Sequence, residues 1–181
     1  MSAREHSDGR CGVAMAALYA VAVLGAVAAV VTVLRLSDPE PPARAARPGK
    51  ILLTVQGMGR HAQFDLQALK ALPQLTQKVH TPWYLRKVAF RGPLLRDVLA
   101  AAGMDGTWIS AVSVNDFEMG FPIDEVTEYD AIVALSMDGQ SMPARRHGPL
   151  FLVFPYDAIP SERLRYYYSL SVWQLDQLNV R

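Results

Sequence analysis

The stretch that decides the fold is "VHTPWYLRKVAFRGPLLRDVLAAAG", residues 79–103. Its first half is rich in β-branched and aromatic residues, which favour strands, and Pro82-Trp83 marks a corner between two of them. Beyond Gly92 the apolar residues follow helical spacing, and Gly103 suits the left-handed conformation that often ends a helix. The residues expected to face inward on this helix are Leu94, Leu95, Val98, Leu99 and Ala102. The stretch therefore predicts two strands, a tight corner and an amphipathic helix.

Further elements are predicted on both sides of this stretch. A helix is expected within residues 64–74, with Asp65 available as its N-cap, and a single helical turn at 122–126. Apolar runs bounded by turn residues predict strands at residues 51–57, 75–81, 108–116, 131–139, 149–155 and, as one or two strands, 166–180. Strands outnumber helices and no βαβ alternation recurs. The fold class is therefore α+β, mostly β-sheet with short peripheral helices.

A long apolar segment precedes this domain. Residues 11–34, "CGVAMAALYAVAVLGAVAAVVTVL", carry no charge and are long enough for a helix to cross a hydrocarbon core of about 30 Å. A cleavable signal peptide has a shorter apolar region, and the small-residue site at Ala43-Arg44-Ala45 lies unusually far from it. A buried core helix would show a polar face, which is missing here. We expect one transmembrane helix, uncleaved.

The flanking charges do not fix the orientation of this anchor. Arg4 and Arg10 precede the span, whereas Arg35, Arg44, Arg47 and Lys50 follow it. The positive-inside rule, counted in this way, favours a cytoplasmic C-terminus. A short tail, one span and a folded domain are nevertheless the usual layout of an exported, anchored module. We expect an inner-membrane, single-pass protein with a periplasmic domain.

These features divide the chain into four parts. Residues 1–10 form an N-terminal tail and residues 11–35 the transmembrane anchor. Residues 36–50 are rich in proline with mixed charges and no apolar period, which is typical of a stiff linker. Residues 51–181 form the folded domain.

Composition excludes several function classes. The formal net charge of the 181-residue chain is +1, so no overall field indicates a nucleic-acid partner. The single cysteine, Cys11, excludes a disulfide framework and a cysteine-rich metal site. The sequence has no P-loop, no GxGxxG and no Gly-x-Ser-x-Gly motif, so nucleotide-binding and acyl-transfer readings have no support.

A few polar and aromatic residues are candidates for a binding cleft. Trp83 either lines a pocket or anchors the core, and Asn115 and Asp116 either meet a ligand at a strand end or simply form a turn. The histidines His61, His80 and His147 lack metal-site spacing, so we expect no metal centre built from them.

Two arginine-containing segments are candidates for anion binding. "ARRHGP", residues 144–149, presents two arginines before a predicted strand, although such turns are more often solvated loops. "ERLRYYY", residues 162–168, interleaves Arg163 and Arg165 with tyrosines, a mixture that can also stack on single-stranded nucleic acid. Because the chain is nearly neutral and carries a predicted membrane anchor, we expect no nucleic-acid partner.

Five segments of the domain, taken in order, resemble the oxidoreductase molybdopterin-binding domain. This is the central domain of sulfite oxidase and of the periplasmic methionine sulfoxide reductase catalytic subunit. The resemblance runs from about Ile51 to Arg181 and is closest to short, standalone bacterial versions. The segments are "DLQALKALPQLTQKVHTPW", "FRGPLLRDVLAAAG", "VSVNDFEMGFPIDEV", "AIVALSMDGQSMPARRHGPLFLVFPYD" and "SLSVWQLDQL".

The resemblance implies a sulfite-oxidase-type fold and a particular metal ligand. In catalytic members a cysteine thiolate binds molybdenum from a loop about ten residues before an aromatic-x-Gly-x-Leu turn. That turn is residues 90–94 here, so the loop falls near His80 and Thr81, which are not cysteines. Imidazole or hydroxyl in place of thiolate would change the charge and redox potential of the metal. The resemblance leaves Arg163 and Arg165 as candidates for binding the pterin phosphate.

Two functional hypotheses follow. In the first, the domain is degenerate at the metal site and binds a small anionic ligand or a partner protein of a membrane complex, with His80, Thr81, Trp83, Asn115 and Asp116 in the former cofactor cleft. In the second, it is an active molybdopterin-dependent oxidoreductase that acts on a small oxyanion or sulfoxide without a cysteine ligand. His80 or Asp116 would then assist proton transfer.

Overall fold

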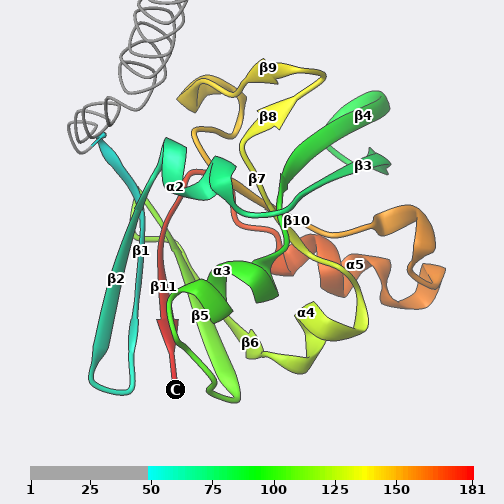
Figure 1. Cartoon of the computed structure of the whole chain (residues 1–181). Coiled ribbons are helices and arrows are strands. Elements are labelled where there is room, and N and C mark those ends of the chain that lie inside the picture. Colours follow the sequence, from blue (N-terminus) through cyan, green and yellow to red (C-terminus); the bar gives the residue numbers. More distant parts are fainter. Residues whose placement is uncertain (1–48) are drawn as a thin grey trace, which may run out of the picture. The chain divides into compact units, whose positions relative to one another are not determined.

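The computed structural model describes residues 49–181, which fall within one compact unit, Arg47–Arg181 (Figure 1). Within this described part, no helix is long and apolar enough to cross a membrane. Residues 1–48, which include the predicted tail, the predicted anchor and all but the last two residues of the predicted linker, lie outside it. The anchor therefore stays a prediction.

The larger of the sheets has five strands in the order β2-β1-β11-β5-β6. The last strand of the chain lies at its centre, since β11 pairs parallel with β1 and antiparallel with β5. Ile109, Ala111, Leu175 and Leu178 are buried on this sheet. The strand bounds are β1 (Ile51–Gly57), β2 (Arg60–Asp65), β5 (Trp108–Ser113), β6 (Glu118–Pro122) and β11 (Leu175–Val180).

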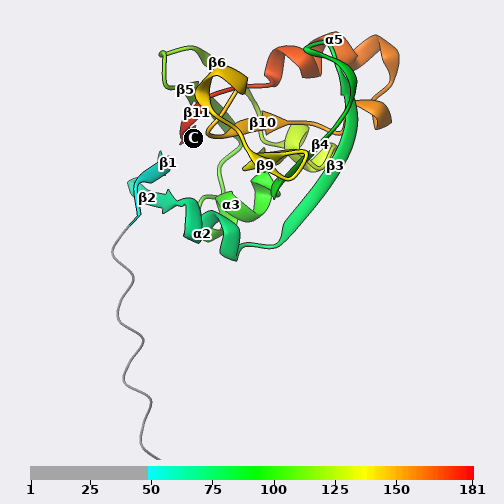
Figure 2. The ribbon, with the colours of Figure 1, turned by 90° about the horizontal axis from the view of Figure 1, so that it is seen from above.

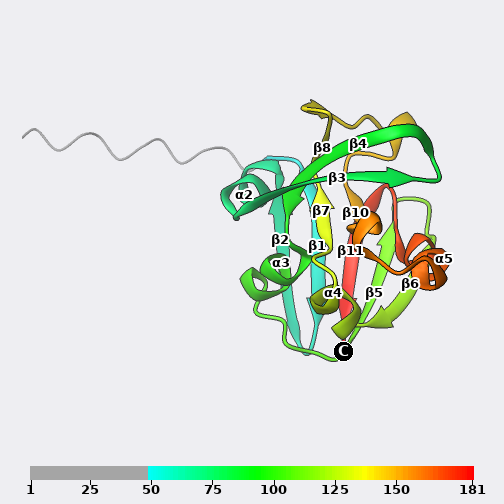
Figure 3. The same ribbon diagram turned by 90° about the vertical axis from the view of Figure 1, so that its right-hand side faces the viewer.

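A second, four-stranded sheet has the order β3-β4-β8-β9, and β7 and β10 form a separate antiparallel pair. The strand β3 runs from α2 at one side of the domain to the neighbourhood of α5 at the other (Figures 2 and 3). The bounds are β3 (Gln74–Thr81), β4 (Tyr84–Pro93), β7 (Ile132–Ala134), β8 (Ser136–Met137), β9 (Gln140–Ser141) and β10 (Phe151–Val153).

Short helices cover the sheets. They are α2 (Leu66–Ala71), α3 (Leu95–Ala101), α4 (Asp124–Glu128) and α5 (Ser161–Leu170), with 3-10 turns η1 (Ala144–Arg146) and η2 (Tyr156–Ala158). Asp65 caps α2 as expected, accepting a hydrogen bond of 2.8 Å from the Ala68 amide. Gly103 ends the α3 region with φ of 68°. The described domain is mostly β-sheet with a few short helices, as the sequence predicts.

The deciding stretch folds largely as predicted. Residues 79–81 end β3, Pro82 and Trp83 form the turn, and Tyr84 begins β4. Three of the inward-facing residues on α3, Leu95, Val98 and Leu99, are buried, whereas Leu94 and Ala102 are partly buried.

Three expectations about local structure are wrong. His80 and Thr81 do not lie in the loop that the resemblance implies, because the reversal is confined to Pro82-Trp83. They end the strand β3, where Thr81 pairs with Tyr84, as the strand predicted at residues 75–81 has it. Residues 166–170 end the helix α5 and do not form a strand, since Tyr167 and Leu170 bury one helical face. The predicted strand at 131–139 is divided into β7 and β8. The strand β2, whose only buried residue is Phe64, is not among the predicted strands.

Candidate ligand-binding site

Three separate segments enclose an apolar pocket of about 480 Å³. The β3–β4 turn, the β5–β6 turn and the end of α5 meet at one side of the domain (Figure 3). Phe117 and Trp173 are 47% and 39% exposed, so large aromatic surface faces the opening. The lining residues are Pro82, Trp83, Asn115, Phe117, Met119, Tyr168, Ser169, Ser171 and Trp173.

Trp83 forms the inner wall of this pocket. Its ring packs edge-on against Phe151 at a centroid distance of 5.4 Å and against Tyr168 and Trp173 at 5.9 Å each. Tyr156, fully buried beneath, is 6.1 Å away. Edge-to-face packing of this kind adds to the free energy of simple burial. Trp83 is therefore both a core anchor and a pocket residue, the two alternatives that the sequence left open.

His147 supports this aromatic wall from the segment before β10. It has a left-handed backbone with φ of 66°, and its carbonyl accepts a hydrogen bond from the amide of Gln174, next to Trp173. Its ring stacks on Phe151 and lies 4.9 Å from the ring of Trp173. Burial lowers the pKa of His147, so the imidazole is neutral at physiological pH.

A chain of hydrogen bonds fixes the polar floor of the pocket. The Ser171 hydroxyl lies 2.6 Å from the Tyr156 hydroxyl and donates to the Tyr167 carbonyl. Burial, foremost, raises the pKa of Tyr156, so this phenol stays protonated and donates to Ser171. These groups are satisfied within the protein and serve to hold the wall in place.

Two of the predicted cleft residues, Trp83 and Asn115, line the pocket together. Asp116 lies next to Asn115 but does not line it, and its φ of 62° shows that it serves the β5–β6 turn. His80 is exposed on β3, where its amide and its ring Nδ1 both approach Asp157. Burial alone would raise the pKa of Asp157. The hydrogen bonds from Lys87 and His80 outweigh this effect, so the net result is a lowered pKa.

Thr81 lies at the inner end of β3, only 8% exposed. Within the described part of the chain, its hydroxyl oxygen is buried and has no hydrogen-bond partner. A buried unsatisfied hydroxyl is costly, so this position is an exception that needs a reason.

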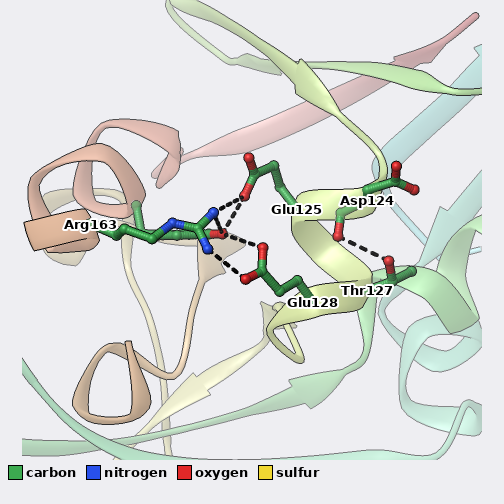
Figure 4. A network of polar contacts seen from close by, with 6 residues as sticks. Asp124, Glu125, Thr127, Glu128 and Arg163 are labelled. Atoms are coloured by element: carbon green, nitrogen blue, oxygen red, sulfur yellow. Dashed lines mark hydrogen bonds and ion pairs between the residues drawn. The ribbon is translucent and has the colours of Figure 1, made fainter. Parts of the chain in front are cut away.

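The two predicted anion-binding arginines differ in their surroundings. Arg163 bonds to Glu128 at 2.5 Å and to Glu125 at 3.3 Å, and it donates to the Tyr167 hydroxyl at 2.9 Å (Figure 4). Two carboxylates from α4 therefore already neutralise it. Arg165 is exposed on the same helix and forms no ion pair with another described residue.

Three residues of this site, Tyr168, Trp173 and His147, are not among the predicted cleft residues. Tyr168 lies in a segment whose pattern predicts a strand, and Trp173 has no local signal. The sequence around His147 indicates only an anion-binding loop or, with the other histidines, a metal ligand. Aromatic residues at predicted turns are the signal that groups Trp83 with Phe117.

Fold and site together define a compact, mostly β domain with an aromatic pocket beside the end of β3. The family described as the oxidoreductase molybdopterin-binding domain matches residues 40–158. The chain belongs to this family. The match begins within the predicted linker and stops before α5 and β11, although β11 is the central strand of the larger sheet. A comparison with curated proteins found no match.

The residues at the end of β3 do not fit a molybdenum centre held by a protein thiolate. Thr81 offers a neutral hydroxyl, His80 points to Asp157, and residues 49–181 contain no cysteine. A hydroxyl is a harder and weaker ligand than thiolate. In this same range, no group of three or more histidine, cysteine, aspartate or glutamate side chains is arranged to hold a metal ion. Arg163 is also poorly suited to a phosphate, because its guanidinium already serves two carboxylates.

Proposed function

We propose that this chain is a membrane-anchored, extracytoplasmic member of the family that binds a ligand through the aromatic pocket and does not act as a conventional molybdenum enzyme. The observation that carries the proposal is the contrast at the end of β3. The position that the resemblance assigns to the metal ligand holds Thr81, whose hydroxyl has no partner among residues 49–181. The pocket next to it is open and lined by aromatic side chains.

The pocket walls indicate the chemistry of the ligand. Four aromatic side chains and Met119 provide flat, apolar surface, and Asn115 and Ser169 provide polar groups at the margin. Of the residues that the structure describes, no charged side chain lines the pocket. Such a site favours an uncharged, planar or apolar group with a few hydrogen-bonding atoms, either a small molecule or a side chain of a partner in a membrane complex.

The membrane location is part of the proposal. It is supported by the uncharged segment 11–34 and the proline-rich linker after it. An anchor would keep the pocket close to a membrane-bound partner and raise its effective concentration.

Metal analysis tests the first half of the proposal. The full chain is purified from a host that makes molybdopterin, and its molybdenum content is measured by mass spectrometry. We expect far less than one molybdenum per chain. A stoichiometric metal content would overturn the proposal and favour an oxidoreductase that holds its cofactor without a cysteine ligand.

Pocket occupancy tests the second half. The probe is Nile red, an uncharged planar dye whose fluorescence rises in apolar sites. Ser169→Trp places a large ring in the pocket, whereas Arg165→Trp places the same ring on the exposed face of α5. We expect Ser169→Trp to abolish most of the fluorescence gain and Arg165→Trp to retain it. Equal binding by both variants, with both folded, would show that the pocket is not the binding site.

A further inference from the structure

A second pocket, of about 410 Å³, lies on the four-stranded sheet beside α2, away from the aromatic site. Its polar lining comes from five elements and includes Lys70 of α2, Arg91 of β4, Ser136 of β8 and Ser141 of β9. Gln74, at the start of β3, also lines it. These residues were not among the sequence-based candidates.

The register of the sheet brings these side chains to one face. Arg91 of β4 pairs with Ser136 of β8, and Ser136 pairs with Ser141 of β9. On the other side Arg91 pairs with Thr76 of β3. Directly paired residues of neighbouring strands point to the same face of a sheet, with Cβ atoms about 5 Å apart. One arginine and three hydroxyl side chains therefore form a single polar row across four strands.

The charge in this pocket is positive. No aspartate or glutamate lines it, and among the described residues neither Lys70 nor Arg91 forms an ion pair. Two other cations of β4 are already neutralised by ion pairs: Arg86 pairs with Asp138, and Lys87 pairs with Asp157. Two cations that share a pocket repel each other unless an anion lies between them.

We propose that this pocket, here named the α2–β9 pocket and defined by Lys70, Gln74, Arg91, Ser136 and Ser141, binds a phosphate ester. The guanidinium of Arg91 presents a planar fork that matches two phosphate oxygens, and the hydroxyls and Lys70 can donate to the others. The pocket volume is many times the roughly 30 Å³ of one water molecule, so it has room for an organic group on the phosphate. Leu66 and Leu135 give that group an apolar wall.

A soluble phosphate ester and a lipid headgroup share this chemistry. The site lies near the point where the chain enters the domain: the Gly49 amide donates to the Asp65 carboxylate at 3.0 Å, and Leu66 lines the pocket. Figure 1 shows α2 beside the beginning of β1. If the preceding segment is a membrane anchor, an anionic headgroup is the nearer source. That choice of source rests on the proposed anchoring, whereas the phosphate site itself does not.

The test compares two double variants with the same loss of charge. Lys70→Gln with Arg91→Gln removes both pocket cations. Arg60→Gln with Arg181→Gln removes two exposed arginines elsewhere, neither of which is a candidate for anion binding. All the chains are full length, and circular dichroism and thermal melting verify that each is folded. The first arm titrates glycerol 3-phosphate, at constant ionic strength, into protein in a neutral detergent and follows binding by calorimetry.

The second arm uses nanodiscs of phosphatidylcholine with or without phosphatidylglycerol, and measures hydrogen exchange of residues 66–71 and 136–141. We expect the parent and the Arg60/Arg181 variant to bind the ester or to gain protection with phosphatidylglycerol. The Lys70/Arg91 variant should bind at least about tenfold more weakly, or lose that protection.

Binding in the first arm alone identifies a soluble ester, and protection in the second identifies the headgroup. The proposal is overturned if the parent shows neither, or if the two double variants weaken binding equally. None of these results depends on molybdenum content or on the aromatic pocket, so this inference and the proposed function fail separately.

Discussion

The hydroxyl of Tyr84 lies 2.8 Å from Nδ1 of His147, which joins the start of β4 to the segment before β10. Burial raises the pKa of Tyr84 and lowers the pKa of His147, so the phenol is the donor and the neutral imidazole the acceptor. The His147 ring then carries its proton on Nε2. This bond holds His147 against Phe151 and Trp173, and so supports the wall of the aromatic pocket.

The first prediction concerns the pH dependence of stability. The folded-state pKa of His147 lies below the ordinary value of 6.5, so the unfolded chain binds the proton more readily. The contribution of neutral His147 is therefore complete above about pH 7 and is lost as the pH falls below about 6.5. The melting temperature of the parent should decrease over this range, and His147→Gln should reduce the slope. An equal slope in both proteins would contradict the assignment.

A second prediction concerns Gly92, in the stretch that decides the fold. A Cβ atom at this position would lie 1.9 Å from the Val133 carbonyl oxygen, because β4 passes close to β7. Gly92→Ala should destabilise the domain by about 3 kcal/mol, since neither backbone can move easily. Denaturant unfolding measures the change.

The comparison for this variant is Gly59→Ala. Gly59 has φ of 73° but no atom within 4 Å of its Cβ position. It should cost only the roughly 1–2 kcal/mol of a left-handed alanine. If Gly92→Ala lowers the free energy of unfolding by less than Gly59→Ala does, β4 and β7 do not approach each other as closely as described.

A third prediction separates the two arginines of α5. Arg163→Gln leaves Glu125 and Glu128 without their cation, whereas Arg165→Gln removes an exposed side chain without an ion pair among the described residues. The melting temperature should fall clearly for Arg163→Gln and hardly for Arg165→Gln. The bond from Arg163 lowers the pKa of Glu128, so its contribution is present above about pH 4.5 and lost as the pH falls further.

Acid pH is the internal control for this pair. The difference between the parent and Arg163→Gln should shrink below about pH 4, where the carboxylates become protonated. Neither substitution should change the molybdenum content. A loss of bound molybdenum in either variant would restore these arginines as candidates for the pterin phosphate.

Much of the fold could be predicted because its signals are local. Asp65 caps α2 by accepting a hydrogen bond from the amide of Ala68, three residues along the chain. The apolar spacing of α3 decides which of its residues are buried. The strand β2 and the helix α5 lack such signals. In β2 only Phe64 is buried, and α5 is rich in tyrosines, whose placement is decided by tertiary packing.

The aromatic pocket could be predicted only in part, for a related reason. Trp83 and Asn115 follow recognisable turn signals. Tyr168 and Trp173 join them only because α5 and the segment after it return to the β3–β4 turn. The ion pairs of Arg163 are likewise contacts between α4 and α5 that no sequence spacing encodes. Non-local contacts of this kind are the part of a site that periodicity does not report.

The last prediction concerns Thr81, the residue at the position of the missing thiolate. Its hydroxyl is buried without a partner among residues 49–181, so Thr81→Val should stabilise the domain by about 1 kcal/mol. The control on the same strand, Thr76→Val, changes an exposed residue and should stay within about 0.5 kcal/mol of the parent. A loss of stability in Thr81→Val would mean that the hydroxyl has a partner in solution, such as a water or a ligand.

The same position gives a test of metal uptake. Thr81→Cys should fold normally, because the thiol is close in size to the threonine side chain. It should take up more molybdenum than the parent in a host that makes molybdopterin. His80→Cys should take up less than Thr81→Cys, because His80 is exposed on the other face of β3. If neither cysteine variant gains molybdenum while both are folded, the end of β3 is not the former metal position.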